Sequence, residues 1–169
     1  MLLVIMVVSS YYRKERLGQL EALCDRLLAP IVSASQPGSE TLVIAAERWR
    51  RLQRTATSPP LMAARLALLK PGNTLSADMA TAPKSIRDRV RSELVAVAIS
   101  QHPIRKRFGS QWVFPGRLAS YLFVAYPLNP QQGVKSAGLL VNLGPLKRDV
   151  VKLNNLMLSY FGVNLVVFT

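Results

Sequence analysis

The side chains best suited to bind a ligand are arginines and lysines that gather in the middle of the chain. The first of three clusters is the stretch RWRRLQR over residues 48–54, the second covers residues 84–91 and the third covers residues 105–107. A guanidinium fork can bind two phosphate oxygens at once, and an aromatic ring can stack on an unpaired base. Trp49, Phe108 and Trp112 lie within or beside the clusters. The candidate nucleic-acid-binding residues are Arg48, Arg50, Arg51, Arg54, Lys84, Arg87, Arg91, Arg105, Lys106 and Arg107.

The charge distribution also favours binding of a polyanion such as nucleic acid. The 169 residues carry a formal net charge of +13, and residues 48–117 alone hold fourteen Lys/Arg against three Asp/Glu. A positive charge so concentrated attracts nucleic acid or an anionic membrane surface. The sequence contains no signature of a known RNA-binding module. We therefore expect RNA binding that is led by the phosphate backbone and weakly specific for sequence.

The sequence shows no catalytic, metal or cofactor motif, so we predict a protein that is not an enzyme. It lacks the phosphate loop of the common NTPases and the glycine fingerprint of dinucleotide-binding folds. Cys24 and His102 are the only residues of their types, whereas a structural zinc site takes about four such ligands. Two alternatives stay open. The chain could be a module that binds an acidic protein partner, or a nucleotide-using enzyme with a site assembled from scattered residues.

The hydrophobic pattern predicts an α/β fold, a mixed sheet with flanking helices that opens with a β-α-β unit. The apolar run at residues 2–8 is typical of a strand buried on both faces. A helix over 13–29, ended by Pro30, and a strand over 41–45 complete the unit. The opening run is far shorter than the ~20 residues that span a bilayer. Its basic residues follow it, unlike those of a signal peptide. We therefore expect no membrane span and no secretion.

Further along the chain we expect helices, a hairpin and a C-terminal β-α-β extension. Trp49 and Leu52 fall on the helix face that should contact the core, opposite the arginines. The break PLNPQQG divides a compact α/β core over 1–129 from an extension or tail over 130–169. The expected elements are helices over 45–55, 58–70 and 83–100, hairpin strands over 111–114 and 118–126, then a strand over 138–143, a helix over 145–160 and a strand over 163–168.

This layout resembles the minor core protein of cystoviruses, the segmented double-stranded RNA bacteriophages. The likeness rests on the compact part that begins MLLVIMVVSS, the basic middle, the break at PLNPQQG and the forty-residue tail. It implies a non-enzymatic homodimer that helps polymerase-complex assembly and RNA packaging in the procapsid, together with other core proteins. The chain would then reside in the virion core or in the cytoplasm of the host cell.

Overall fold

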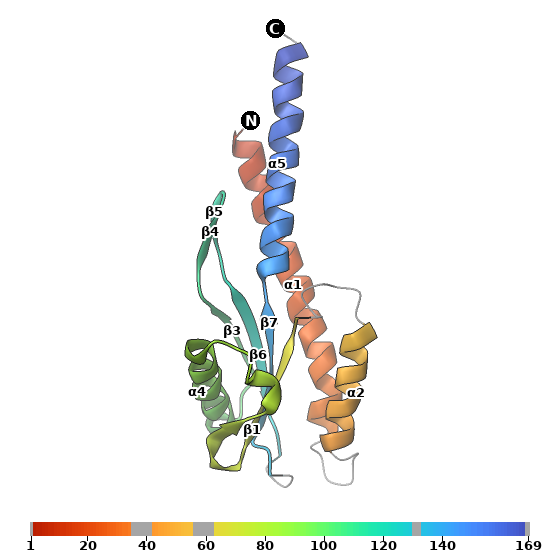
Figure 1. The fold of residues 1–169 in the computed structure, drawn as a ribbon, viewed down its shortest axis with the longest axis vertical. Coiled ribbons are helices and arrows are strands. Elements are labelled where there is room, and N and C mark those ends of the chain that lie inside the picture. The colour runs from red at the N-terminus through yellow and green to blue at the C-terminus, as the bar shows by residue number, and fades with distance from the viewer. Residues whose placement is uncertain (1, 35–41, 56–62, 130–132, 168–169) are drawn as a thin grey trace.

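Figure 1 shows a computed structural model of the chain, in which helices flank one sheet and two helices reach past it at one end. The structure describes residues 2–34, 42–55, 63–129 and 133–167. The α-helices are α1 (Leu2–Ala34), α2 (Leu42–Thr55), α4 (Lys84–Ser100) and α5 (Gly144–Val167). The strands are β1 (Arg65–Lys70), β2 (Thr74–Leu75), β3 (Ile104–Phe108), β4 (Gln111–Val113), β5 (Gly116–Leu118), β6 (Tyr121–Pro127) and β7 (Ser136–Asn142).

The main sheet has five strands in the order β2-β1-β7-β6-β3, and each neighbouring pair is antiparallel. β7 lies at its centre, where Leu139 is the register partner of Leu66 on one side and of Val124 on the other. The α/β prediction is confirmed, but the predicted mixed sheet is wrong. Parallel strands need a crossover connection, and the two N-terminal segments that were expected to frame one are helical.

The predicted N-terminal β-α-β unit is therefore wrong as well. Residues 2–8 open helix α1, which runs for 33 residues, and residues 42–45 open α2, while residue 41 lies outside the described part. A short apolar run cannot by itself distinguish a buried strand from a helix. No Gly or Pro interrupts the chain between Val8 and Arg13, so the helix simply continues. It also passes Pro30, because Ile31 and Ala34 extend its buried face.

Two other predicted elements have the opposite secondary structure. The helix expected over 58–70 is strand β1 from residue 65 onward, and residues 58–62 lie outside the described part. Leu66 and Leu68 of β1 pack on one side of the sheet, and Ala67 and Leu69 pack on the other. Burial of both faces removes the alternation that marks a strand. The final strand expected over 163–168 is instead the end of α5, as far as residue 167.

Several predictions are confirmed. Helix α4 spans residues 84–100 with Val90, Leu94 and Val97 buried, and β7 and α5 contain most of the predicted strand and helix. The hairpin turn is also correct, but its second strand divides into β5 and β6. Gly109, at φ +71°, lies against Ser120 at this division, where a Cβ would come 2.8 Å from the Ser120 Oγ. β4 and β5 therefore form a separate ribbon beyond the main sheet.

The sheet separates two hydrophobic cores. Helices α1 and α2 cover one face, and α4 covers the other (Figure 1). The second core depends on a close fit between Phe123 of β6 and Gly138 of β7. A Cβ placed on Gly138 would come 2.7 Å from the Phe123 ring and 3.0 Å from the Val124 carbonyl oxygen. Phe123 is fully buried, so its ring has little room to move away.

We expect Gly138→Ala to lower the free energy of unfolding by about 1–3 kcal/mol, because the added methyl overpacks the core. Gly18 provides the matched control, since it lies within helix α1 with open space around its Cβ position. Gly18→Ala should raise stability by up to about 1 kcal/mol, because alanine favours the helix. Urea denaturation of both variants measures the two changes. A neutral or stabilising Gly138→Ala would contradict the close fit at Phe123.

Candidate functional site

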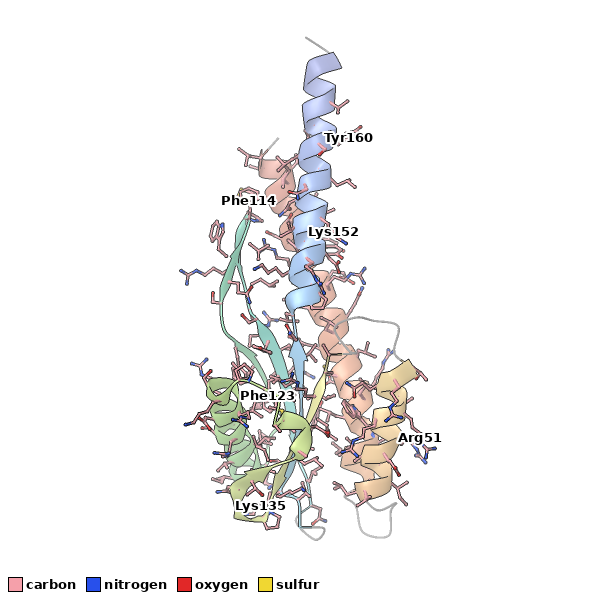
Figure 2. All side chains as sticks on the ribbon, viewed as in Figure 1. Arg51, Phe114, Phe123, Lys135, Lys152 and Tyr160 are labelled. Atoms are coloured by element: carbon pink, nitrogen blue, oxygen red, sulfur yellow. The ribbon has the colours of Figure 1, made fainter. Side chains whose placement is uncertain are left out.

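The arginines of RWRRLQR lie on α2, on the outer side of one sheet face (Figure 2). Trp49 is 2% exposed and anchors the helix in the core, as predicted. Leu52 is 44% exposed, so its predicted contact with the core is wrong. All four arginines of the stretch are exposed. The Nη2 of Arg50 forms an ion pair with the Oδ2 of Asp78 at 3.2 Å.

The second predicted cluster lies on α4, across the sheet from α2. Lys84 and Arg91 are exposed, whereas Arg87 is half-buried and donates to the Ala80 carbonyl at 3.4 Å. Arg91 pairs with Asp88 at 3.5 Å, one turn away on the same helix. Because the sheet separates α4 from α2, these residues and the α2 arginines face different sides of the molecule.

The third predicted cluster lies on strand β3, at the edge of the sheet, and each of its cations is paired. Arg105 donates to Asp25 at 2.7 Å and Arg107 donates to Glu21 at 2.9 Å, so both hold β3 to α1. Lys106 points to the other face and pairs with Glu93 of α4 at 3.6 Å. The structure thus places the ten predicted residues on three surfaces, of which the α2 surface is the most open.

Asp25 of α1 contacts two neighbouring strands, β3 and β6. Besides Arg105, it accepts a hydrogen bond of 2.9 Å from the Tyr126 hydroxyl on β6. Burial raises the pKa of the Tyr126 phenol, and its bond to the Asp25 carboxylate raises it further. The bond to Asp25 in turn raises the pKa of the Arg105 guanidinium. This network stabilises the charged form of Arg105 and the neutral form of Tyr126, as expected for a structural link.

The sequence analysis missed a large apolar surface at the free end of α1 and α5, which we call the helical tip (residues 2–12 and 153–163). The two helices are antiparallel there, and both chain ends lie at this end of the molecule (Figure 1). The tip residues contain no charged side chain. On α1 the signal was present in the apolar run over residues 2–8, which was assigned to a buried strand. The exposed large apolar residues are Leu2, Leu3, Val4, Met6, Val7, Val8 and Tyr11 on α1 and Leu156, Leu158, Tyr160 and Val163 on α5.

A buried polar cluster, which we call the polar joint (Ser9, Arg13 and Asn154), fixes the base of the tip. The Ser9 hydroxyl of α1 donates to the Asn154 Oδ1 of α5. Asn154 donates in turn to the Phe114 carbonyl at the end of the β4–β5 ribbon, at 2.7 Å. Arg13 donates to the same carbonyl at 2.7 Å and to that of Val113. The joint therefore ties α1, α5 and the ribbon together.

The described residues offer no arrangement that resembles a metal centre. Within those ranges, no three His, Cys, Asp or Glu side chains converge as metal ligands would. His102 is exposed, and its ring Nδ1 lies 2.5 Å from the Ser100 carbonyl oxygen. Among the helices that the structure describes, none is both long enough and apolar enough to cross a membrane.

Comparison with known proteins gives this chain no family. No protein-family model matches the sequence, and no curated protein matches it either.

Cys24, on the inner side of α1, is fully buried, and burial raises the pKa of its thiol to about 12, with smaller contributions from Asp25 and Glu21. Only the thiolate reacts readily with disulfide reagents. We therefore expect the native protein at pH 8 to react with an aromatic disulfide reagent at least roughly a hundredfold more slowly than the urea-unfolded chain. Cys24 is the only cysteine, so the signal has one source. Equal rates in the two states would contradict the packing of α1 on the sheet.

Proposed function

We propose that this protein is a non-enzymatic binding module that docks on an anionic membrane surface through its helical tip. The observation that carries the proposal is the exposure of six apolar side chains in the first turns of α1, which ranges from 38% to 73%. Half-exposed Leu and Val side chains each gain on the order of 1 kcal/mol when they leave water. Exposed apolar surface of this extent marks an interaction site.

The distribution of these side chains around the helix favours lipid over a second protein. Residues 2, 3, 4, 6, 7 and 8 point outward, while Ile5 is buried and Ser9 contacts α5. At about 100° per residue, the outward positions cover an arc of about 240°. One partner helix, or a second copy of the chain, would cover only one side of such an arc. The hydrocarbon boundary of a membrane surrounds the helix and covers all of it.

The charges behind the tip fit an anionic surface. Lys14 and Arg16 follow the charge-free segment on α1, and Arg148 and Lys152 precede it on α5. All four side chains are exposed. A basic residue near an anionic membrane surface contributes about 1 kcal/mol to binding. The exposed Glu15 and Asp149 lie among these four cations in the sequence, so the two segments behind the tip carry a net charge of +2, which favours anionic over neutral lipid.

Aromatic residues lie at the same end of the molecule, as in the interfacial belts of membrane proteins. Tyr11 and Tyr160 are exposed on the two tip helices, and Trp112 and Phe114 are exposed on the β4–β5 ribbon. Figure 2 shows Phe114 beside α5, at a height between Lys152 and Tyr160. When the ends of the helices enter the hydrocarbon, the ribbon would therefore reach the headgroup region.

Replacing two tip residues in the variant Leu3→Glu/Val7→Glu should weaken binding to vesicles with about 30% phosphatidylglycerol by at least tenfold. Both side chains leave the lipid, and two negative charges are added at the membrane surface. Co-flotation of the purified protein with vesicles measures the affinity of each variant for the membrane. Val43→Glu/Ile44→Glu is the matched control, because it places the same charges on exposed apolar residues of α2, away from the tip. The control should bind within about twofold of the wild-type protein.

Equal vesicle binding by the tip variant and the wild-type protein would contradict the proposal. So would a protein that ignores vesicles but forms a dimer that Leu3→Glu/Val7→Glu dissociates, because the tip would then be a contact between copies of the chain.

RNA binding led by phosphate contacts is the second candidate, and the open arginine surface of α2 favours it. Arg51 lies on the outer side of α2 (Figure 2). Arg50 and Arg54 line a cleft of about 330 Å³ together with Arg65. An extended basic surface of this kind suits a phosphate backbone. Under this candidate the chain would be an assembly or packaging factor, a homodimer that acts with other core proteins in a virion core or the host cytoplasm.

Under this second candidate, Arg51→Gln/Arg54→Gln should reduce the slope of log K against log[salt] for single-stranded RNA by between about 1 and 2. Glutamine keeps nearly the same helix propensity, so the fold should persist. Arg148→Gln/Lys152→Gln removes equal charge near the tip, away from α2, and should leave the slope nearly unchanged. Fluorescence anisotropy titrations over a salt series measure both slopes. An unchanged slope in the α2 variant would assign these arginines to an ordinary solvated helix face.

A further inference from the structure

A basic cavity of about 410 Å³ lies below the helical tip, between α1 and the start of the β4–β5 ribbon. We call it the collar cavity. One face of α1 lines it with Ser10, Arg13 and Lys14, since positions three and four apart share a helix face. Arg107 of β3 and Arg117 of β5 line the opposite side. Three elements that are distant in sequence thus bring four cations to one cavity.

Arg13 is the unusual member of this set, because it is only 9% exposed. Its Nη2 donates to the carbonyls of Val113 and Phe114, whereas its Nε is buried and has no hydrogen-bond partner. Burial also lowers the pKa of this guanidinium. A buried cation normally lies against an anion, since neutral carbonyls compensate only part of its lost hydration. The collar cavity is therefore short of negative charge.

The other lining residues do not supply that charge. Arg107 pairs with Glu21 at 2.9 Å, so its own charge is largely balanced. Across the ranges that the structure describes, Arg13, Lys14 and Arg117 have no carboxylate within ion-pair distance. No acidic residue lines the cavity in those ranges. Three cations without a balancing acid face one space that a ligand could enter.

We propose that the collar cavity binds a phosphate monoester. Such a group carries close to two negative charges and three terminal oxygens near neutral pH, which can accept from Arg13, Lys14 and Arg117 together. Arginine forks match phosphate oxygens in pairs, and the Ser10 hydroxyl offers one more donor. A monocarboxylate has one charge and two oxygens, so it would leave most of the positive charge unbalanced. The cavity has far more volume than the ~30 Å³ of one water molecule, so an organic group attached to the phosphate fits as well.

The phosphate monoester could come from a soluble metabolite or from a lipid headgroup, and the two sources can be separated. The soluble probe is glycerol 3-phosphate, titrated by calorimetry against the whole chain at constant ionic strength, with glycerol as the uncharged comparison. The lipid probe is a vesicle with about 20% phosphatidic acid, which has a monoester headgroup. Vesicles with phosphatidylglycerol at equal surface charge carry only a diester. The soluble arm contains no membrane, so it does not depend on docking of the helical tip.

The decisive variant is Lys14→Gln/Arg117→Gln, in which two exposed cations are replaced and the buried Arg13 stays in place. Loss of two charge-assisted hydrogen bonds should weaken glycerol 3-phosphate binding by about tenfold or more. Arg148→Gln/Lys152→Gln removes equal charge outside the cavity, and its affinity should stay within about twofold of the wild-type value. Thermal melting with and without glycerol 3-phosphate confirms that each variant is folded and reports the same affinities through the shift in Tm.

The outcomes separate clearly. Tenfold weakening confined to Lys14→Gln/Arg117→Gln supports a soluble ligand. Lys14 also contributes to docking on any anionic vesicle, so the lipid arm compares the ratio of the two affinities. A loss by the same variant of its preference for phosphatidic acid over phosphatidylglycerol supports a lipid source. Equal weakening of glycerol 3-phosphate binding by Lys14→Gln/Arg117→Gln and by Arg148→Gln/Lys152→Gln would overturn the inference. So would a wild-type protein that neither binds glycerol 3-phosphate nor prefers phosphatidic acid over phosphatidylglycerol. Leu3→Glu/Val7→Glu should abolish vesicle docking yet leave glycerol 3-phosphate binding intact, so failure of one proposal is distinguishable from failure of the other.

Discussion

The polar joint of Ser9, Arg13 and Asn154 is the contact on which everything beyond the sheet depends. At this level α1 and α5 leave the sheet, so the hydrophobic core no longer fixes their positions. The side chains of Ser9, Arg13 and Asn154 are almost fully buried, and buried polar groups are stable only with partners. Ser9 donates to Asn154, and Asn154 and the Nη2 of Arg13 donate to carbonyls at the ribbon end. The joint thereby sets the rotation of both helices, which decides the residues that face outward at the tip and the shape of the cavity beside Arg13.

Arginine has three different roles in this structure, and the net charge alone does not distinguish them. Arg105 and Arg107 link an edge strand to α1 through Asp25 and Glu21. These pairs are half-exposed, so each contributes only about 0–1 kcal/mol to stability, and their value lies in orienting the strand. Arg13 serves the buried joint, and Arg51 faces solvent. Of these four arginines, only Arg51 remains open to a macromolecular polyanion.

The sequence predicted those elements whose ends carry local signals. Helix α4 begins after Pro83, and the β4–β5 turn contains Pro115, just before Gly116 opens β5. Prediction of secondary structure from the sequence failed for apolar runs that lack such signals, since a run such as residues 2–8 suits a buried strand and a helix equally well. Trp49 was placed correctly by helical periodicity, whereas Leu52 was not, since Leu52 is 44% exposed. The collar cavity and the joint could not be predicted, since Ser9 and Asn154 are 145 positions apart.

The fit between Phe123 and Gly138 constrains how this chain can change over time. The two residues lie on adjacent strands and share one space in the core. An alanine or serine at position 138 becomes tolerable only after the ring at position 123 has been replaced by something smaller. Replacing the ring first leaves a cavity, at a cost of about 3–5 kcal/mol for loss of the whole ring, whereas changing Gly138 first makes the added Cβ overlap the ring. Substitutions at these two positions should therefore occur as pairs among relatives of this protein, with glycine retained wherever an aromatic ring faces it.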